Sequence, residues 1–303
     1  MKVLVVGNGG REHAIVWKLA NDSCRPQVYC VPGNGGTAQH AKNVEISAND
    51  VEKIVDWCEK NKPDLVIIGP EAPLCAGLTD LLELKNIPVF GPNKEAAQLE
   101  GSKDFAKEIM KSAKIPTSEY QTFTDINLAC EYIKSKQFPI VIKADGLAAG
   151  KGVTVAETLE QAQSAIHDAL EENVFGNAGS KVVIEDFLEG EEASFIAVVS
   201  GEEIIPLATS QDHKAAYDGD KGPNTGGMGA YSPAPIVTDE LHKKIMDEVM
   251  SPTVKGLIAE GSSYLGFLYA GLMIKDDEIN AVSYTHLRAH ETPEHLVCRL
   301  LLE

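Results

Sequence analysis

The sequence of 303 residues contains few basic side chains and few aromatic rings. Lysine and arginine together number 27, against 45 aspartates and glutamates, so the formal net charge at pH 7 is −18, and only 6% of the residues are aromatic. Nucleic acids and anionic membranes bind to basic surfaces. The charge balance therefore argues against both as partners, although a few lysines and backbone amides gathered in one place would still bind a phosphate.

Paired cysteines and long apolar runs are also missing. The six cysteines form no Cys-x-x-Cys pair and no His/Cys metal spacing, as is typical of reduced thiols in the cytosol. No stretch approaches the roughly 18 consecutive apolar residues of a membrane span, and the apolar run in the opening MKVLVVG is too short for a signal peptide. We therefore expect a cytoplasmic protein, and we expect it to be a monomer of two domains.

Residues 1–101 are expected to form an α/β domain of the Rossmann-like type. Short apolar runs alternate with segments of helical pattern, and we predict strands at 3–6, 28–31, 65–68 and 89–90 and helices at about 11–20, 50–60 and 76–85. Buried β-branched runs that alternate with helices indicate a parallel sheet. The turns GNGG, PGNGG and GPEAP each follow a strand, so they should meet at the carboxyl edge of the sheet, where ligands bind.

The first of these turns, in GNGGREHA, is close to the G-x-G-x-x-G fingerprint of dinucleotide-binding proteins. The fingerprint requires a glycine where this chain has Glu12, and no acidic residue closes the second strand. A single phosphate group on the amides at the start of the helix fits better, because the N-terminus of a helix attracts anions. A nicotinamide-dependent dehydrogenase stays open as an alternative.

Residues 102–281 are expected to form a second domain of α+β type, with a small lid subdomain at about 120–188. Ser102 suits the N-cap of a helix that ends near Lys114. Further helices are predicted at about 125–135, 158–173 and 239–260, and strands near 182–185 and 267–274 and on both sides of Gly201 within 189–208. The polar stretch 210–233 shows no pattern of secondary structure, and a loop of that length is usually functional or disordered.

The stretch 140–155, IVIKADGLAAGKGVTV, carries the strongest chemical signal. Two β-branched runs flank a glycine-rich loop that contains Lys151, which indicates a strand, a loop and a returning strand. Glycines let backbone N–H groups turn toward an anion, and a lysine adds positive charge. The Walker pattern G-x-x-x-x-G-K-[ST] fails, because Asp145 stands at its first glycine and Gly152 at its Ser/Thr. We predict a phosphate loop; a hairpin that binds nothing is the alternative.

Polar residues near this loop complete the expected nucleotide site. Lys143 ends an apolar strand and either reaches solvent or, as we prefer, faces an anion. Glu185 precedes Phe187 and Leu188, whose side chains would flank an adenine, and Glu192 would accept hydrogen bonds from ribose hydroxyls. Each acidic residue taken alone is better explained as a solvated surface group.

The stretch 210–233 also contains residues that suit anion binding. It supplies DHK at 212–214 and NTGGMG at 224–229, which combine donors with unhindered backbone. Asp212 beside His213 is compatible with a hydrolase triad, but the sequence has no G-x-S-x-G elbow. We therefore do not expect a covalent nucleophile.

Several motifs of this chain occur together in a family order: GNGGREHA, PGNGGT, GPEAPL, IKADGLAAGKGV, EDFLEGEEASF, SQDHK and GPNTGGMGAYSP. From Met1 to about Asn280 the chain thereby resembles the phosphoribosylamine–glycine ligase family, also called glycinamide ribonucleotide synthetases. The resemblance implies an ATP-grasp domain behind a Rossmann-like N-terminal domain. It also implies ATP-dependent ligation of glycine to 5-phosphoribosylamine through glycyl phosphate, which yields glycinamide ribonucleotide, ADP and phosphate in de novo purine synthesis, with Mg²⁺ or Mn²⁺ as cofactor.

Carried over residue by residue, the resemblance implies three sets of site residues. ATP would be bound by Lys103, Lys143, Asp145, Gly146, Gly150, Lys151, Gly152, Glu185, Phe187, Leu188 and Glu192. Glycine and phosphoribosylamine would be bound by Gly9, Gly10, Arg11, Glu12, Pro70, Glu71, Asp212, Lys214, Asn224, Thr225, Gly226 and Gly227. Catalysis would rest on charge neutralisation and positioning rather than on a nucleophile, by Lys143, Lys151, Asp212, Lys214 and Asn224.

The chain departs from the family pattern near residue 281. Family members continue with a strand that carries a Glu-x-Asn magnesium pair and then R-F-G-D-P-E, whereas this chain ends INAVSYTHLRAHETPEHLVCRLLLE. The spacing puts the expected glutamate at Tyr284 and the expected asparagine at His286, and neither is a hard oxygen ligand. We therefore predict no metal ligands, an ATP-grasp domain that is incomplete after residue 281 and lacks one sheet strand, and a non-native tail at 282–303. A divergent natural C-terminus is the alternative.

Two further interpretations of the activity stay open. Without metal ligands the chain would be an impaired ligase, or an ATP-binding fragment that does not catalyse a reaction. Within the same fold, another ATP-grasp carboxylate–amine ligase of purine synthesis would differ in its co-substrates.

Overall fold

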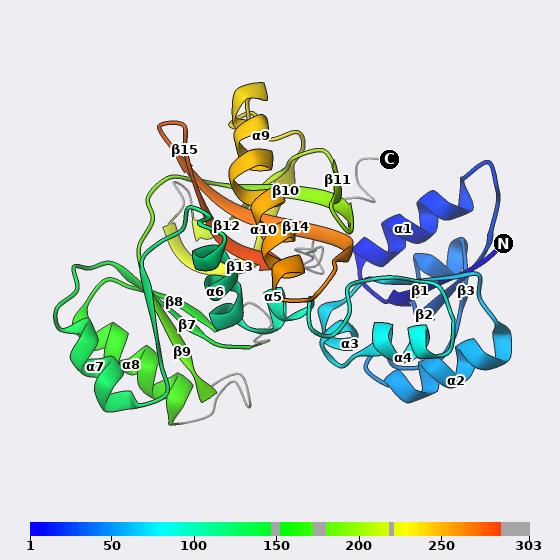
Figure 1. The fold of residues 1–303 in the computed structure, drawn as a ribbon, viewed down its shortest axis with the longest axis horizontal. Helices are drawn as coiled ribbons and strands as arrows, with labels where there is room; N and C mark the ends of the chain where they lie inside the picture. The colour runs from blue at the N-terminus through cyan, green and yellow to red at the C-terminus, as the bar shows by residue number, and fades with distance from the viewer. Residues whose placement is uncertain (147–151, 172–179, 218–220, 286–303) are drawn as a thin grey trace.

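The computed structural model describes residues 1–146, 152–171, 180–217 and 221–285. These residues form an N-terminal domain, a small domain and a larger central domain that lies between them (Figure 1). The predicted order of architectures, a parallel α/β domain followed by α+β structure, is confirmed. In the described part of the chain, every helix is too short or too polar to cross a membrane.

The N-terminal domain is a parallel sheet with helices on both faces. Its strands pair in the order β3-β2-β1-β4-β5 and comprise β1 (Lys2–Gly7), β2 (Gln27–Pro32), β3 (Lys42–Asn43), β4 (Leu65–Ile68) and β5 (Val89–Phe90). Alternate residues of β1 point to opposite faces. Val3 and Val5 therefore pack with helix α1 (Gly10–Ala20), whereas Leu4 and Val6 pack with α2 (Val51–Asn61) and α4 (Leu78–Leu84).

The helix predicted near 76–85 is confirmed as α4, which begins and ends within two residues of the predicted bounds. The structure adds two short elements that were not predicted, α3 (Glu71–Cys75) and the 3-10 turn η1 (Thr37–Gln39). Gly77 separates α3 from α4 with a φ of 89°, a conformation that glycine adopts readily and that ends a helix. As a result, Glu71 begins a helix directly after β4.

The small domain is an antiparallel sheet covered on one side by two helices (Figure 1). The strands pair in the order β6-β9-β7-β8 and comprise β6 (Tyr120–Phe123), β7 (Ile140–Ala144), β8 (Val153–Ala156) and β9 (Val182–Asp186). Helices α7 (Ile126–Ile133) and α8 (Leu159–Leu170) contribute to its core. Because β7 and β8 pair antiparallel, with Lys143 opposite Val153, the predicted strand, loop and returning strand are confirmed on both sides of the loop.

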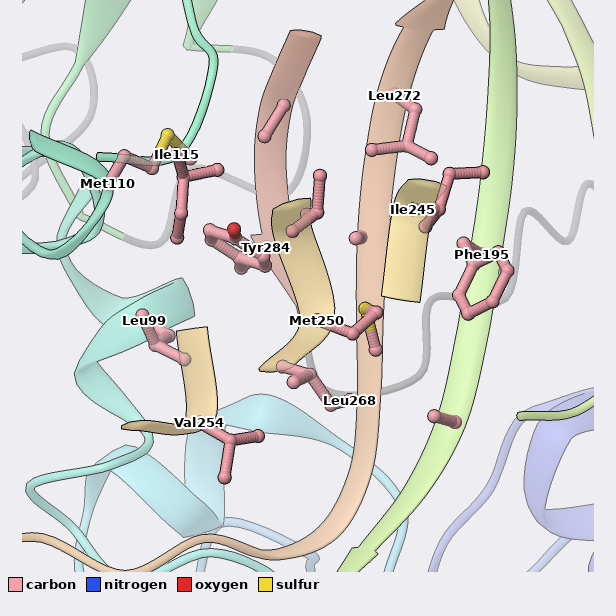
Figure 2. Close-up of a cluster of buried hydrophobic side chains, with 14 of the residues drawn as sticks. Leu99, Met110, Ile115, Phe195, Ile245, Met250, Val254, Leu268, Leu272 and Tyr284 are labelled. Carbon is pink, nitrogen blue, oxygen red and sulfur yellow. The ribbon is translucent and has the colours of Figure 1, made fainter. Parts of the chain in front are cut away.

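The central domain is a second antiparallel sheet packed against helices. Its strands pair in the order β11-β10-β14-β15 and comprise β10 (Glu191–Ser200), β11 (Glu203–Pro206), β14 (Leu265–Lys275) and β15 (Glu278–Thr285). The helices are α5 (Gln98–Gly101), α6 (Lys103–Ser112), α9 (Asp239–Ile245), the π-helical η3 (Met246–Met250) and α10 (Ser251–Ala259). Figure 2 shows Phe195 and Leu272 of the sheet facing Ile245 and Met250 of the helices in the buried core.

The stretch 210–233, predicted as an irregular loop, forms a two-stranded antiparallel sheet instead. Strands β12 (Gln211–Tyr217) and β13 (Lys221–Tyr231) pair with Gln211 opposite Tyr231, and their register shifts twice along the ladder. The prediction failed because a glycine-rich strand shows no alternation of apolar and polar side chains, while its backbone groups still pair.

The expected loss of a sheet strand after β14 is also wrong for the described residues. Strand β15 pairs antiparallel with β14, and Ile279, Ala281 and Tyr284 are buried in the central core. Strand pairing uses the backbone, so β15 forms even though its side chains differ from those expected at the family's metal site.

Two polar and aromatic contacts join the N-terminal and central domains. The ring of Phe90 meets the ring of Phe267 edge to face, with centroids 5.0 Å apart. The Ser262 hydroxyl donates to Oδ1 of Asn93 over 3.0 Å. These contacts fix the end of β5 against the start of β14.

Candidate functional site

The three turns of the N-terminal domain meet at one edge of the sheet, as predicted. The Gly33 N–H donates to the Gly7 carbonyl (3.1 Å), and Nδ2 of Asn34 donates to the Asn8 carbonyl (2.8 Å). On the other side, Nη1 of Arg11 donates to the Gly69 carbonyl (2.9 Å). The turns after β1, β2 and β4 therefore hold one another in place and form a common edge.

Glu12 is buried at this edge rather than directed into solvent. Only 2% of Glu12 is exposed, and its Oε2 accepts a hydrogen bond from the Gly9 N–H over 2.7 Å. A Cβ added at Gly7 or at Gly69 would overlap the Glu12 side chain. Glu12 thus fills the space between the ends of β1 and β4, the place where the dinucleotide fingerprint has its third glycine. Its carboxylate also lies 3.4 Å from Nε of Arg11.

The other N-terminal site residues lie on the same edge. Gly9 is the N-cap of α1 and Gly10 its first residue, while Pro70 is the N-cap of α3 and Glu71 its first residue. Glu71 also lines a small cavity of about 10 Å³, together with Leu74, Ala96, Ala97, Leu99, Glu100 and Tyr264. The edge therefore presents two helix N-termini, which suits an anionic ligand.

A second group of charged side chains gathers where α6, β7 and β9 meet. Nζ of Lys143 lies 2.7 Å from Oε1 of Glu185, and Nζ of Lys107 lies 3.0 Å from Oε2. The Ser118 hydroxyl also donates to Oε2 over 2.8 Å. The three charged side chains are 8% exposed or less. A single buried carboxylate therefore sits between two ammonium groups.

The electrostatics of this group follow from burial and pairing. Burial alone would raise the pKa of Glu185, but the positive charges of Lys143 and Lys107 outweigh it, so its pKa lies below the usual value. Burial lowers the pKa of Lys107, an effect that Glu185 partly offsets. The 2.7 Å contact of Lys143 with Oε1 is the shorter of the two ion pairs, so each carboxylate oxygen of Glu185 faces one ammonium group.

Asp145 closes the N-terminus of α6 instead of facing the loop interior. Its carboxylate accepts hydrogen bonds from the backbone N–H groups of Lys103 (2.6 Å) and Asp104 (3.2 Å) and from the Ser102 hydroxyl (3.2 Å). In turn, Nζ of Lys103 donates to the Gly146 carbonyl over 2.8 Å. The first residues of the predicted phosphate loop are therefore anchored to α6.

The residues expected around the nucleoside lie along the chain just after β9. Phe187 is 40% exposed and Leu188 is half-buried, so both offer apolar surface. Glu192 is half-buried on β10. The register of β7 on β9 places Val141 opposite Glu185, so Lys143 and Glu185 approach diagonally across two neighbouring strands.

The β12–β13 hairpin carries the remaining predicted residues. Asp212 is 9% exposed and pairs with Ala230, and Asn224 pairs with Ala215. The side chains of Lys214, Asn224, Thr225, Gly226 and Gly227 lie outside what the structure describes, as do Gly150, Lys151 and His286 entirely. The hairpin contacts β10, because the backbones of Ser194 and Ser210 bond to each other.

Tyr284 does not fit a metal site. It stands where the family's metal-binding glutamate is expected, but it is 2% exposed and packs in the central core (Figure 2). The Thr253 hydroxyl donates to its phenol oxygen over 2.6 Å, and burial raises its pKa. Mg²⁺ prefers carboxylate oxygens and water, which a buried neutral phenol does not replace. In the described residues, no three His, Cys, Asp or Glu side chains are grouped to hold a metal.

Sequence reasoning missed Lys107, Thr117 and Ser118. Nζ of Lys107 donates to the hydroxyls of Thr117 (2.8 Å) and Ser118 (2.9 Å). A signal was present, because Lys107 follows Lys103 by four residues and so lies on the same face of the predicted helix. A lysine on the buried face of a helix needs a partner of opposite charge. For Lys107 that partner is Glu185, which lies too far along the chain for a local pattern to reveal.

Comparison with known proteins identifies the family to which this chain belongs. A model of the phosphoribosylglycinamide synthetase N domain matches residues 1–100, and a model of the ATP-grasp (A) domain of the same family matches residues 101–289. The chain belongs to the phosphoribosylglycinamide synthetase family. The phosphoribosylamine–glycine ligase of Escherichia coli strain K12 is 57% identical over 276 residues, which cover 90% of this chain and 64% of that protein.

Solved structures place this phosphoribosylglycinamide synthetase family member in the ATP-grasp fold. The crystal structure of a phosphoribosylamine–glycine ligase from Thermotoga maritima superposes with a TM-score of 0.82 at 34% identity, covering 97% of this chain and 70% of that one. The biotin carboxylase domain of a 2-oxoglutarate carboxylase from Hydrogenobacter thermophilus, solved with MgADP, shares the fold at a TM-score of 0.74 and 18% identity, covering 96% and 65%.

The chain spans 64% of the length of the Escherichia coli relative. The match to the family's ATP-grasp domain runs to residue 289, beyond the departure that we placed after residue 281. The foreign origin of 282–303 stays a prediction.

Proposed function

We propose that this chain carries the nucleotide- and substrate-binding parts of an ATP-dependent ligase that joins glycine to 5-phosphoribosylamine. The reaction would proceed through glycyl phosphate and yield glycinamide ribonucleotide, ADP and phosphate, in the cytoplasmic synthesis of purines by a monomer. The names of the relatives support the substrates. The observation that carries the proposal is the convergence of Lys103, Lys143 and Glu185 at the described start of the glycine loop.

The nucleotide would bind between the described start of the loop, at Asp145 and Gly146, and the end of β9. Lys143 and Lys103 would approach its phosphates, each charge-assisted hydrogen bond contributing on the order of 1.5–3 kcal/mol. Oε1 of Glu185, which already pairs with Lys143, would also accept a hydrogen bond from a donor on the adenine edge. Phe187 and Leu188 would cover the ring with apolar surface. Glu192 would bind the ribose.

The carboxylate and amine partners would lie between the N-terminal edge and the β12–β13 hairpin. The N-termini of α1 and α3 would hold the phosphate of phosphoribosylamine. Asp212 and the residues at 214 and 224–227 would orient glycine so that its carboxylate oxygen attacks the γ-phosphorus of ATP. The amine of phosphoribosylamine then attacks the acyl carbon and phosphate leaves. Positioning and charge neutralisation account for this chemistry.

A second candidate function is ATP binding without turnover. The observation that favours it is the buried Tyr284 at the expected metal position. A divalent ion would neutralise charge on the ATP phosphates, and Tyr284 offers no carboxylate to hold it.

ADP release by this chain tests both candidates. Release with Mg²⁺ and ATP only when glycine and phosphoribosylamine are both present would support the ligase. ATP binding without release would support the non-catalytic candidate. ATP hydrolysis that is indifferent to both co-substrates would overturn the assignment of substrates.

A further inference from the structure

The buried charged group at the base of the loop does not balance. It contains two lysines, Lys107 and Lys143, and one carboxylate, Glu185. The side chains of Lys107 and Lys143 are 2% and 8% exposed, so both ammonium groups are buried. The proposed function directs only Lys143 to phosphate. Buried charges are normally paired. The excess positive charge therefore requires an explanation.

We propose that Lys107 is a positioning residue that neutralises Glu185 and so leaves the charge of Lys143 available for the phosphates of a nucleotide. This inference rests on the proposed function, since it names how the same site attracts its ligand. Lys107 itself would not contact the nucleotide.

The contacts of Lys107 support a structural counter-ion rather than a ligand-binding role. Its three ammonium donors have three close partners, which are the hydroxyls of Thr117 and Ser118 and Oε2 of Glu185. The aliphatic stem comes from α6, and the ammonium also lies 5.3 Å from the centre of the Tyr120 ring. Lys107 is therefore held in one position before any ligand binds.

The same position ties three segments together. The Thr117 hydroxyl donates to the Ala281 carbonyl of β15 over 2.6 Å, and the Ala281 N–H donates to the Pro116 carbonyl over 2.7 Å. Nζ of Lys143 donates to the Val282 carbonyl over 3.2 Å. Lys107 thus orients Glu185 of the small domain against β15 of the central domain.

Removal of the Lys107 charge would leave Glu185 and Lys143 as a balanced pair. The attraction for a diphosphate would then fall, while that for an uncharged nucleoside would not. The measured quantity is the ratio of the Kd of adenosine to the Kd of ADP. We expect Lys107→Met to lower this ratio on the order of tenfold, because charges a few ångströms apart interact strongly at a buried site.

The double variant Lys107→Met/Glu185→Gln restores the excess positive charge and should return the ratio to within about threefold of the wild-type value. Lys111→Met, which removes an exposed lysine one turn further along α6, should leave the ratio unchanged. Both constants are measured by calorimetry on the full chain, and thermal unfolding shows which variants fold.

The outcomes separate the inference from the function on which it rests. If Lys107→Met weakens adenosine and ADP equally, or if the double variant does not restore the ratio, Lys107 has only a structural role and the inference is overturned. If the wild-type chain binds neither ligand, the proposed function fails instead. If Lys107→Met does not fold, Glu185→Gln alone tests the same idea: the ratio should rise, and an unchanged ratio would overturn it.

Discussion

At the scale of single residues, Glu12 shows how one side chain changes the ligand that a fold accepts. The N-terminal domain has the strand order of dinucleotide-binding folds. Glu12 occupies the space between Gly7 and Gly69, and its carboxylate bonds the N-cap of α1. The dinucleotide fingerprint has its third glycine where this side chain stands, so the close approach that the glycine permits is blocked here. The same residue therefore stabilises the edge and disfavours a dinucleotide.

Glu12→Ala should lower the free energy of unfolding by about 2–4 kcal/mol, because a buried, hydrogen-bonded carboxylate is lost beside Arg11. Urea denaturation measures the change. Glu52→Ala removes an exposed acid from the first turn of α2 and should cost less than about 1 kcal/mol. Equal losses in the two variants would show that Glu12 has no special place in the fold.

Glu185 makes the stability of the chain depend on pH. Its pKa in the folded chain lies below the value of about 4.3 in an unfolded chain. The stability that it contributes is therefore complete above that pH and is lost as the pH falls through the folded value. We expect the difference in unfolding free energy between the wild type and Glu185→Gln to be largest near pH 7 and to shrink toward pH 3. A difference that does not vary between these pH values would contradict the pairing with Lys107 and Lys143.

At the scale of secondary structure elements, helix α6 links the loop to the central domain. Ser102 caps the helix through the Phe105 N–H, as its sequence position predicts. Asp145 adds a second cap from 42 residues away. A carboxylate at a helix N-terminus is favoured by the exposed amides and by the helix dipole. The start of the loop is thus fixed by a helix that belongs to another domain.

Asp145→Ala should destabilise the chain by about 1–2 kcal/mol, since three donors at the start of α6 lose their acceptor. Asp125→Ala is the matched control, because Asp125 caps α7 through two N–H groups within its own segment. Both changes should destabilise the fold, but only Asp145→Ala should also weaken ADP binding, measured by calorimetry. Equal ADP affinity in the two variants would show that Asp145 does not contribute to the nucleotide site.

At the scale of the whole molecule, segment 116–118 is where the domains meet. Pro116 and Thr117 bond Ala281 of β15, while Ser118 bonds Glu185 of the small domain. Strand β15 in turn places Tyr284 in the central core. The strand on which the family resemblance predicts metal ligands thus completes the sheet and its core in this chain.

Removal of the divalent metal tests whether β15 has lost the metal site that the family resemblance predicts. Because Tyr284 is buried and offers no carboxylate, EDTA should not weaken ATP binding to this chain by more than about threefold. The Kd of ATP is compared with and without Mg²⁺, and adenosine serves as the control ligand, because it carries no phosphate to bind the metal. A loss of tenfold or more for ATP alone would show that the chain retains a metal site.

The sequence by itself determined the local elements and the family. Asp50, Ser102 and Thr158 cap the helices that follow them because their side chains reach the amide three residues further on. Strands β1 and β4 of the N-terminal domain follow from continuous apolar runs, whereas the polar β3 does not. Only the tertiary structure decided that Glu12 is buried, that Asp145 caps a distant helix and that Lys107 neutralises Glu185. These contacts join segments that lie far apart along the chain or depend on packing between strands, and local periodicity carries no information about either.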